Sequence, residues 1–216
     1  MTRFKFCGLT RGEDVELARS LGASHVGVIL TKSPRQITPE HAADILSAAQ
    51  GMQTVGVYRR RSVGGILDEA RHIGLDVIQL HGHFSRDEIT RIRESFDGAV
   101  WSVIPVDVSK PEADEEMLEA AFLSDAVVMD TSVRGKSGGT GRTFDWERAK
   151  PMVASFSGRT DFILAGGLTP SNVAEAIRTL APAIVDVSSG VELSPGIKDP
   201  DLMKAFAEQV RSASIV

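Results

Sequence analysis

A repeat of short apolar runs and amphipathic segments extends along the whole chain and is the strongest constraint on its fold. Uninterrupted apolar runs rich in β-branched residues are typical of strands buried on both faces of a parallel sheet. The eight predicted strands are Phe4–Gly8, His25–Leu30, Gln53–Tyr58, Val77–Leu80, Ala99–Val103, Ala126–Asp130, Phe162–Ala165 and Ile184–Val187. The eight predicted helices between them are Gly12–Leu21, Pro39–Gln50, Gly64–Ile73, Arg86–Ser95, Asp114–Phe122, Asp145–Phe156, Pro170–Leu180 and Pro200–Arg211.

Eight strand–helix units in 216 residues predict an α/β fold, a closed (β/α)8 TIM barrel that forms one domain over residues 1–216. The alternative is a doubly wound open sheet. A nucleotide-binding sheet of that kind carries a glycine fingerprint after its first strand. This chain has Cys7-Gly8-Leu9-Thr10 at that position, which favours the barrel.

Two turns of small residues follow the last two predicted strands. They are Gly166 and Gly167 after the seventh strand, and Ser188, Ser189 and Gly190 after the eighth. Backbone N–H groups in such turns bind anions, and a short helix expected from Val191 onward would add its positive dipole end. Because the loops after strands seven and eight form the usual phosphate site of a barrel, the two turns predict phosphate binding.

Composition excludes several classes of protein. A net charge of −5 argues against a general nucleic-acid binder but not against a local basic pocket for an anion. The single cysteine, Cys7, excludes an internal disulfide and fits a reducing cytoplasm. No signal peptide is visible at the N-terminus, and no apolar run reaches the length of a membrane span, so we expect no membrane partner.

Cys7 and Asp130 end the first and sixth predicted strands. Catalytic groups of a barrel sit at the C-terminal ends of its strands, so a thiolate at Cys7 could act as a base or nucleophile. Asp130 could act as a general acid or base across the same mouth. The alternatives are a small buried hydrophobe at Cys7 and a helix cap or loop hydrogen bond at Asp130.

Three further polar residues lie near strand ends. Asp186, one residue inside the eighth strand, is expected to have an orienting role, since a buried carboxylate needs hydrogen bonds. Arg35 could clamp a carboxylate through two parallel hydrogen bonds, or it could be a solvated surface arginine. His81 follows the fourth strand, where a lone histidine could equally be a polar group at the start of a loop. His81 and His83 lack a set of carboxylate partners for a metal, so we predict no metal site.

The sequence resembles the phosphoribosylanthranilate isomerase family from Lys5 to about Phe206. The motifs that carry the resemblance are Lys5-Phe6-Cys7-Gly8-Leu9-Thr10, Ser33-Pro34-Arg35, Val55-Gly56-Val57, Gln79-Leu80-His81-Gly82, Asp130-Thr131, the segments Ser137–Trp146, Ala165–Val173 and Asp186–Glu192, and Pro195–Asp199. Each motif alone is modest, but their order and spacing together are specific. The segment Val28–Thr31 departs from the family pattern, as does the basic stretch Arg59–Arg61.

The resemblance implies an enzyme of tryptophan biosynthesis. Its reaction is the Amadori rearrangement of N-(5-phosphoribosyl)anthranilate to 1-(2-carboxyphenylamino)-1-deoxyribulose 5-phosphate. Asp130 matches the general acid, which protonates the ribose ring oxygen and opens the ring to a Schiff base. Cys7 matches the general base, which removes the proton from C2 of the sugar. Tautomerism of the enolamine to the ketone completes the reaction.

The resemblance also implies a binding site without a cofactor. Arg35 matches the residue that binds the anthranilate carboxylate. The residues that match the phosphate site are Gly139, Gly141, Gly166, Gly167, Ser188, Ser189 and Gly190. The expected partner is therefore a small phosphosugar–anthranilate substrate, and we expect the chain to act as a monomer.

This chemistry places a demand on two pKa values. Asp130 must start protonated and Cys7 must lose its proton, whereas ordinary pKa values of about 3.9 and about 8.5 favour the opposite arrangement at neutral pH. A partly desolvated mouth would raise the pKa of the carboxyl group, and nearby positive groups would lower that of the thiol.

Other functions of the same fold remain as alternatives. A metal-dependent epimerase would need inward histidine and carboxylate ligands on several strands, which we do not find in the sequence. A related isomerase of histidine biosynthesis would carry aspartate in place of Cys7. A barrel that only binds a phosphorylated ligand would keep the glycine turns but would not need Cys7 or Asp130. Rapid reversible oxidation would instead indicate redox sensing by Cys7.

Overall fold

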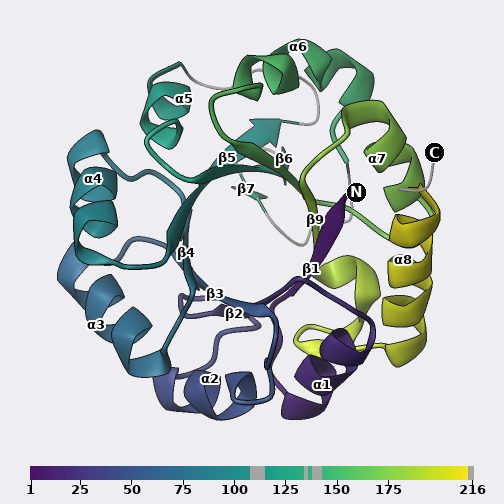
Figure 1. The fold of residues 1–216 in the computed structure, drawn as a ribbon, viewed down its shortest axis with the longest axis horizontal. Coiled ribbons are helices and arrows are strands. Elements are labelled where there is room, and N and C mark those ends of the chain that lie inside the picture. Colours follow the sequence, from purple (N-terminus) through teal and green to yellow (C-terminus); the bar gives the residue numbers. More distant parts are fainter. Residues whose placement is uncertain (108–114, 134–135, 138–142, 214–216) are drawn as a thin grey trace.

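A closed parallel barrel forms the centre of the computed structural model (Figure 1), which describes residues 1–107, 115–133, 136–137 and 143–213. Its eight strands are β1 (Arg3–Cys7), β2 (His25–Ile29), β3 (Gln53–Tyr58), β4 (Val77–His81), β5 (Ala99–Asp107), β6 (Ala126–Val133), β8 (Asp161–Ala165) and β9 (Ile184–Val187). Pairing of β1 with β9 and of β5 with β6 closes the ring. The predicted α/β barrel is therefore confirmed.

The α-helices of the described residues surround the barrel (Figure 1). They are α1 (Gly12–Ser20), α2 (Pro39–Leu46), α3 (Val63–Ile73), α4 (Arg86–Ser95), α5 (Glu115–Ala121), α6 (Trp146–Phe156), α7 (Val173–Leu180) and α8 (Pro200–Ala213). Thr38 caps α2 as expected, because its side chain accepts a hydrogen bond from the backbone N–H of His41. The expected start of α7 at Pro170 is wrong. Thr169 and Asn172 instead close a turn through a hydrogen bond from the Thr169 N–H to Asn172 Oδ1.

Two apolar layers hold the barrel together. Inside the ring, Val55, Val77, Trp101, Val128 and Ile163 pack against one another. Outside it, alternate strand residues such as Phe4 and Phe6 pack against the helices. Because side chains alternate along a strand, Lys5 and Cys7 of β1 face the inside of the barrel. This alternation places a buried ammonium and a thiol inside the barrel.

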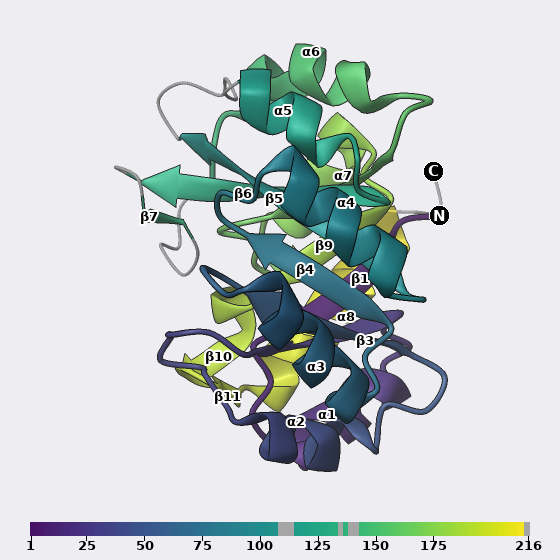
Figure 2. The same cartoon turned by 90° about the vertical axis from the view of Figure 1, so that its left-hand side faces the viewer.

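Three small elements lie at the C-terminal end of the barrel. They are β7 (Lys136–Ser137), the short 3-10 helix η1 (Ser189–Val191), and a hairpin of β10 (Glu192–Ser194) and β11 (Ile197–Lys198). Figure 2 shows β7 and the hairpin at the end toward which the arrows of β4 and β6 point. The helix expected from Val191 onward is therefore wrong. A turn that contains Gly196 at a φ of 85° folds the chain back instead, a conformation that favours glycine.

Candidate active site

A cavity of about 280 Å³ lies at the C-terminal ends of the strands. Its lining includes all the predicted site residues that the structure describes, namely Cys7, Arg35, His81, Asp130, Gly166, Gly167, Asp186, Ser188, Ser189 and Gly190. These residues come from six strand ends and the loops that follow them, which the barrel brings together. The other two predicted residues, Gly139 and Gly141, lie outside the described part of the chain.

Cys7 is buried beside a lysine. Lys5 is fully buried, and its Nζ donates to Asp186 Oδ2 at 2.7 Å and to Gln79 Oε1 at 3.1 Å. A Cβ atom at Gly27 would lie 3.0 Å from Cys7 Sγ and 3.1 Å from Lys5 Nζ, so this glycine leaves room for the two side chains to meet. Burial raises the pKa of Cys7, while the Lys5 ammonium lowers it and Asp186 raises it further. Burial has the larger effect.

Asp130 is buried on β6 in surroundings that favour its protonated form. Burial, and then the negative charge of Asp186, raise the pKa of Asp130 from 3.8 to about 7. His81 Nε2 lies 4.0 Å from Asp130 Oδ2. Burial, followed by the positive charges of Arg59 and Lys5, lowers the pKa of His81 to about 4, so this imidazole is neutral near pH 7. Asp130 can therefore hold a proton at neutral pH.

The reaction needs a protonated Asp130 and a deprotonated Cys7, and the site favours only the first of these. The pKa of Asp130 moves in the direction that a general acid needs. The pKa of Cys7 moves the other way, because loss of hydration around the buried thiol raises it by more than the attraction of Lys5 lowers it. Near pH 7 Cys7 is thus a thiol, and its thiolate is a minor form.

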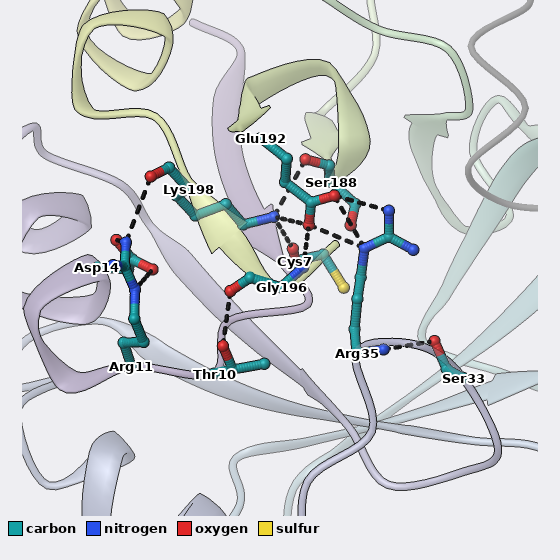
Figure 3. Close-up of polar contacts among 10 residues, drawn as sticks. All are labelled: Cys7, Thr10, Arg11, Asp14, Ser33, Arg35, Ser188, Glu192, Gly196 and Lys198. Carbon is teal, nitrogen blue, oxygen red and sulfur yellow. Dashed lines mark hydrogen bonds and ion pairs between the residues drawn. The ribbon is translucent and has the colours of Figure 1, made fainter. Parts of the chain in front are cut away.

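Arg35 extends across the end of β1 (Figure 3). Its Nε donates to Glu192 Oε1 at 2.8 Å, and its Nη2 donates to Glu192 Oε2 at 2.7 Å. Lys198 Nζ donates to the same carboxylate at 2.9 Å and to the Cys7 carbonyl oxygen at 2.6 Å. The Arg35 guanidinium is thereby fixed beside the cysteine, in the lining of the cavity.

The two small-residue turns lie against each other. Gly166 and Gly167 have φ values of 85° and 68°, which glycine adopts readily. A Cβ atom at Gly190 would lie 1.8 Å from the Leu168 carbonyl oxygen, so packing between the turns also requires glycine there. Ser188 Oγ is buried and has no hydrogen-bond partner among the described residues. A buried hydroxyl without a partner is costly unless a ligand or water satisfies it.

Three charged residues of this site received no individual role in the sequence analysis. Lys5 interrupts an apolar run at a position that shares its strand face with Cys7, and this alternation was the available signal. Glu192 and Lys198 lie in the resembling motifs, but only the hairpin of β10 and β11 brings them to Arg35.

The described residues contain neither a metal-binding cluster nor a membrane-spanning helix. Within the described ranges, no cluster of three or more His, Cys, Asp or Glu side chains has the arrangement needed to hold a metal ion. The helices of the same ranges include none that is long and apolar enough to cross a membrane.

Comparison with known proteins gives one consistent answer. The family described as N-(5'phosphoribosyl)anthranilate (PRA) isomerase matches residues 4–209. An N-(5'-phosphoribosyl)anthranilate isomerase of Haloferax volcanii is 39% identical over 217 residues, which cover 99% of this chain and 95% of the relative.

Solved structures agree with the sequence comparison. One is of monomers generated from the dimeric phosphoribosylanthranilate isomerase of Thermotoga maritima, with a TM-score of 0.81, 34% identity and coverage of 98% of this chain and 100% of that one. Another is a phosphoribosyl anthranilate isomerase in complex with reduced 1-(o-carboxyphenylamino)-1-deoxyribulose 5-phosphate. It has a TM-score of 0.80 and 32% identity, and it covers 98% of this chain and 100% of that one.

Proposed function

The chain belongs to the N-(5'-phosphoribosyl)anthranilate isomerase family, and we propose that Cys7 and Asp130 carry the proton transfers of its reaction. The enzyme acts in tryptophan biosynthesis and converts N-(5-phosphoribosyl)anthranilate to 1-(2-carboxyphenylamino)-1-deoxyribulose 5-phosphate. The observation that carries the residue assignment is a shared cavity in which Asp130 has a pKa of about 7 and faces the same space as Cys7.

Asp130 is the general acid of the first step. Its proton passes to the ribose ring oxygen as the bond between that oxygen and C1 breaks, and the nitrogen lone pair forms the C1=N bond of a Schiff base. The raised pKa supports this role, because general acids work best when their pKa lies near the working pH. The adjacent His81 is neutral and does not compete as a cation for the carboxylate that remains.

Cys7 is the general base of the second step. Its thiolate takes the proton from C2, and the C2–H electrons form the enolamine, which becomes the ketone. The Lys5 ammonium favours the thiolate, and the positive charge of a protonated Schiff base would favour it further. In the form that reacts, Asp130 and Cys7 hold one proton between them, and Asp130 carries it. This form arises from the resting enzyme when the proton of the Cys7 thiol passes to ionised Asp130.

The two ends of the substrate have separate binding groups. Arg35 binds the anthranilate carboxylate. Ser188, Ser189, Gly190, Gly166 and Gly167 bind the phosphate, and Gly139 and Gly141 are proposed to join them. The buried hydroxyl of Ser188, which lacks a partner among the described residues, supports a ligand at this turn. Asp186 orients Lys5 through their 2.7 Å contact, and His81 supports Asp130.

The whole chain is proposed to act as one domain, residues 1–216, in the cytoplasm and as a monomer. The support for a monomer is the distribution of apolar side chains. Within the described ranges, Met1 and Leu193 are the only large hydrophobic residues that are well exposed. Subunit interfaces usually present larger apolar patches.

Single substitutions test the residue assignment. Cys7→Ala and Asp130→Asn should each lower kcat by about 10²-fold or more, as expected for loss of a general acid or base. Turnover of freshly generated phosphoribosylanthranilate is followed through the loss of its fluorescence. Binding of the reduced product analogue, measured by calorimetry, should remain. Arg35→Ala should mainly raise KM.

A matched control is Asp161→Asn, an exposed carboxylate at the opposite end of the barrel. It should leave kcat and KM unchanged. Near-normal kcat in the Cys7 or Asp130 variant would remove that residue from the mechanism, and an unchanged KM in Arg35→Ala would place the carboxylate elsewhere.

A further inference from the structure

The guanidinium of Arg35 donates hydrogen bonds from one of its edges to the Glu192 carboxylate (Figure 3). Arg35 Nε lies 2.8 Å from Oε1 and 3.1 Å from Oε2, and Nη2 lies 2.7 Å from Oε2. The Arg35 and Glu192 side chains are only 14% and 4% exposed. A guanidinium has two edges that can each hold a carboxylate through parallel hydrogen bonds, so Glu192 occupies one of them.

Glu192 is itself fixed in place. Its Oε1 accepts hydrogen bonds from Lys198 Nζ at 2.9 Å and from the backbone N–H of Gly196 at 3.3 Å. The fully buried Lys198 also donates to the carbonyl oxygens of Cys7 at 2.6 Å and Ser188 at 3.1 Å. The carboxylate is thus tied to the ends of β1 and β9, and so to the proposed base and the proposed phosphate turn.

The stem of Arg35 is confined as well. Gly8 follows Cys7 with a φ of 71°, and a Cβ atom there would lie 2.7 Å from Arg35 Cδ. The glycine therefore lets the arginine stem pass close over the backbone beside the cysteine. Arg35 Nη1 donates no hydrogen bond to another described residue, so the Nη1/Nη2 edge has no carboxylate on it within the described part of the chain.

We propose that Glu192 is a positioning residue that holds Arg35 so that its second edge receives the ring carboxylate of the substrate. The proposal rests on the role assigned to Arg35 above. Glu192 takes the Nε/Nη2 edge, and the substrate takes the Nη1/Nη2 edge. The network through Lys198 then sets the distance between the carboxylate-binding group, Cys7 and the phosphate turn. Selection for a carboxylated ring is the property that Glu192 contributes.

A competing role for Glu192 would have the opposite effect on ligand affinity. If Glu192 instead occupied the place of the substrate carboxylate, the two would compete for Arg35. Neutralising Glu192 would then tighten binding of a carboxylated ligand. A positioning residue predicts weaker binding on the same change, so one measurement separates the two.

Two ligands make the test specific for the ring carboxylate. They are reduced 1-(o-carboxyphenylamino)-1-deoxyribulose 5-phosphate and the same compound without its carboxyl group. Calorimetry on the unmutated enzyme should show a strong preference for the first, and Arg35→Ala should abolish it. Glu192→Gln should raise the Kd of the carboxylated ligand by about tenfold, since a lost charged hydrogen bond is worth that factor or more. The Kd of the other ligand should change by less than about twofold.

Asp14→Asn is the matched control. Asp14 is as deeply buried as Glu192, at 3% exposure of its side chain, and accepts two hydrogen bonds from Arg11. Arg11 in turn donates to the Lys198 carbonyl oxygen, so the control changes the same network without touching Arg35 (Figure 3). It should leave the preference between the two ligands intact.

Each remaining outcome has a defined meaning. An unmutated enzyme that binds both ligands equally would overturn the role of Arg35 itself. A preference that is lost in Arg35→Ala but kept in Glu192→Gln would overturn only the role of Glu192. Equal weakening for both ligands, or tighter binding of the carboxylated one, would also overturn it. If the Gln variant does not fold, Glu192→Asp keeps the charge beside Lys198 but shortens the reach, and it should lose the same preference.

Discussion

Function and stability make opposite demands on Asp130. A folded-state pKa of about 7, against 3.8 for the exposed group, means that the fold favours the protonated carboxyl. The cost of ionising it in the fold grows as the pH rises from about 4 to about 7 and stays constant above that. Each pKa unit corresponds to ~1.4 kcal/mol, so ionised Asp130 lowers the free energy of unfolding by up to ~4 kcal/mol.

Asp130→Asn should therefore stabilise the fold while it abolishes turnover. We expect a Tm several degrees higher than that of the unmutated protein at about pH 8, with a gain that shrinks toward about pH 4. Thermal unfolding across this pH range measures it, with Asp161→Asn as the control. A gain that is equal at all pH values would show that ionisation of Asp130 is not its cause.

Cys7 can be followed directly because it is the only cysteine of the chain. Its raised pKa predicts slow alkylation by iodoacetamide near pH 8, since the thiolate is the reacting form. The alkylated fraction, read by mass spectrometry, should match the lost fraction of turnover, and the reduced product analogue should protect both. Full activity after complete alkylation would exclude Cys7 from catalysis.

At the scale of elements, the register of β1 and β9 places Lys5 directly beside Asp186. The pair acts on both proposed proton carriers, since Lys5 lowers the pKa of Cys7 and Asp186 raises that of Asp130. Hydrogen bonds to Asp186 and Gln79 fix the ammonium inside the barrel. The same two strands therefore set the charge around both groups.

Replacing the pair by Lys5→Met with Asp186→Asn should slow alkylation of Cys7. The attraction of Lys5 for the thiolate exceeds the repulsion from Asp186, so loss of both raises the pKa of the thiol. The rate at a fixed pH falls about tenfold for each unit. Because both partners are replaced, neither leaves an unpaired buried charge that would destabilise the fold. Unchanged or faster alkylation would contradict this reading of Lys5.

The sequence predicted the regular elements well. The bounds of β3 (Gln53–Tyr58), β9 (Ile184–Val187) and α4 (Arg86–Ser95) agree residue for residue with the predictions. The apolar periodicity of a parallel barrel depends on local pattern, and this is why it can be read directly. The hairpin of β10 and β11 was missed because three-residue and two-residue strands have no readable period.

The site was predictable in part for the same reason. Strand ends converge in any barrel, so the described residues singled out from the sequence could be expected to share one mouth. The Glu192–Arg35 contact joins residues far apart in the sequence, and side-chain direction in a hairpin decides it. The net pKa of Cys7 was not predictable either, because burial and the charge of Lys5 act in opposite directions on it.

At the scale of the whole molecule, the proposed monomer can be checked by sedimentation equilibrium. A mass of 23.2 kDa that stays constant with concentration is expected, because the described surface exposes few large apolar side chains. The related structure from Thermotoga maritima is of monomers generated from a dimeric enzyme, so a dimer is the alternative that the measurement must distinguish. A mass near twice that of one chain would contradict the proposal.

The most direct test of the proton-carrier assignment is the pH dependence of kcat/KM for the unmutated enzyme. Below the pKa of Asp130 both groups are protonated and no base exists, and above the pKa of Cys7 no acid remains. We therefore expect a bell-shaped profile whose acidic limb has its midpoint near pH 7 and whose basic limb lies above pH 9.0. A profile that is flat through neutral pH and falls only below about pH 5 would contradict it, because the acid would then have the pKa of an ordinary carboxyl group.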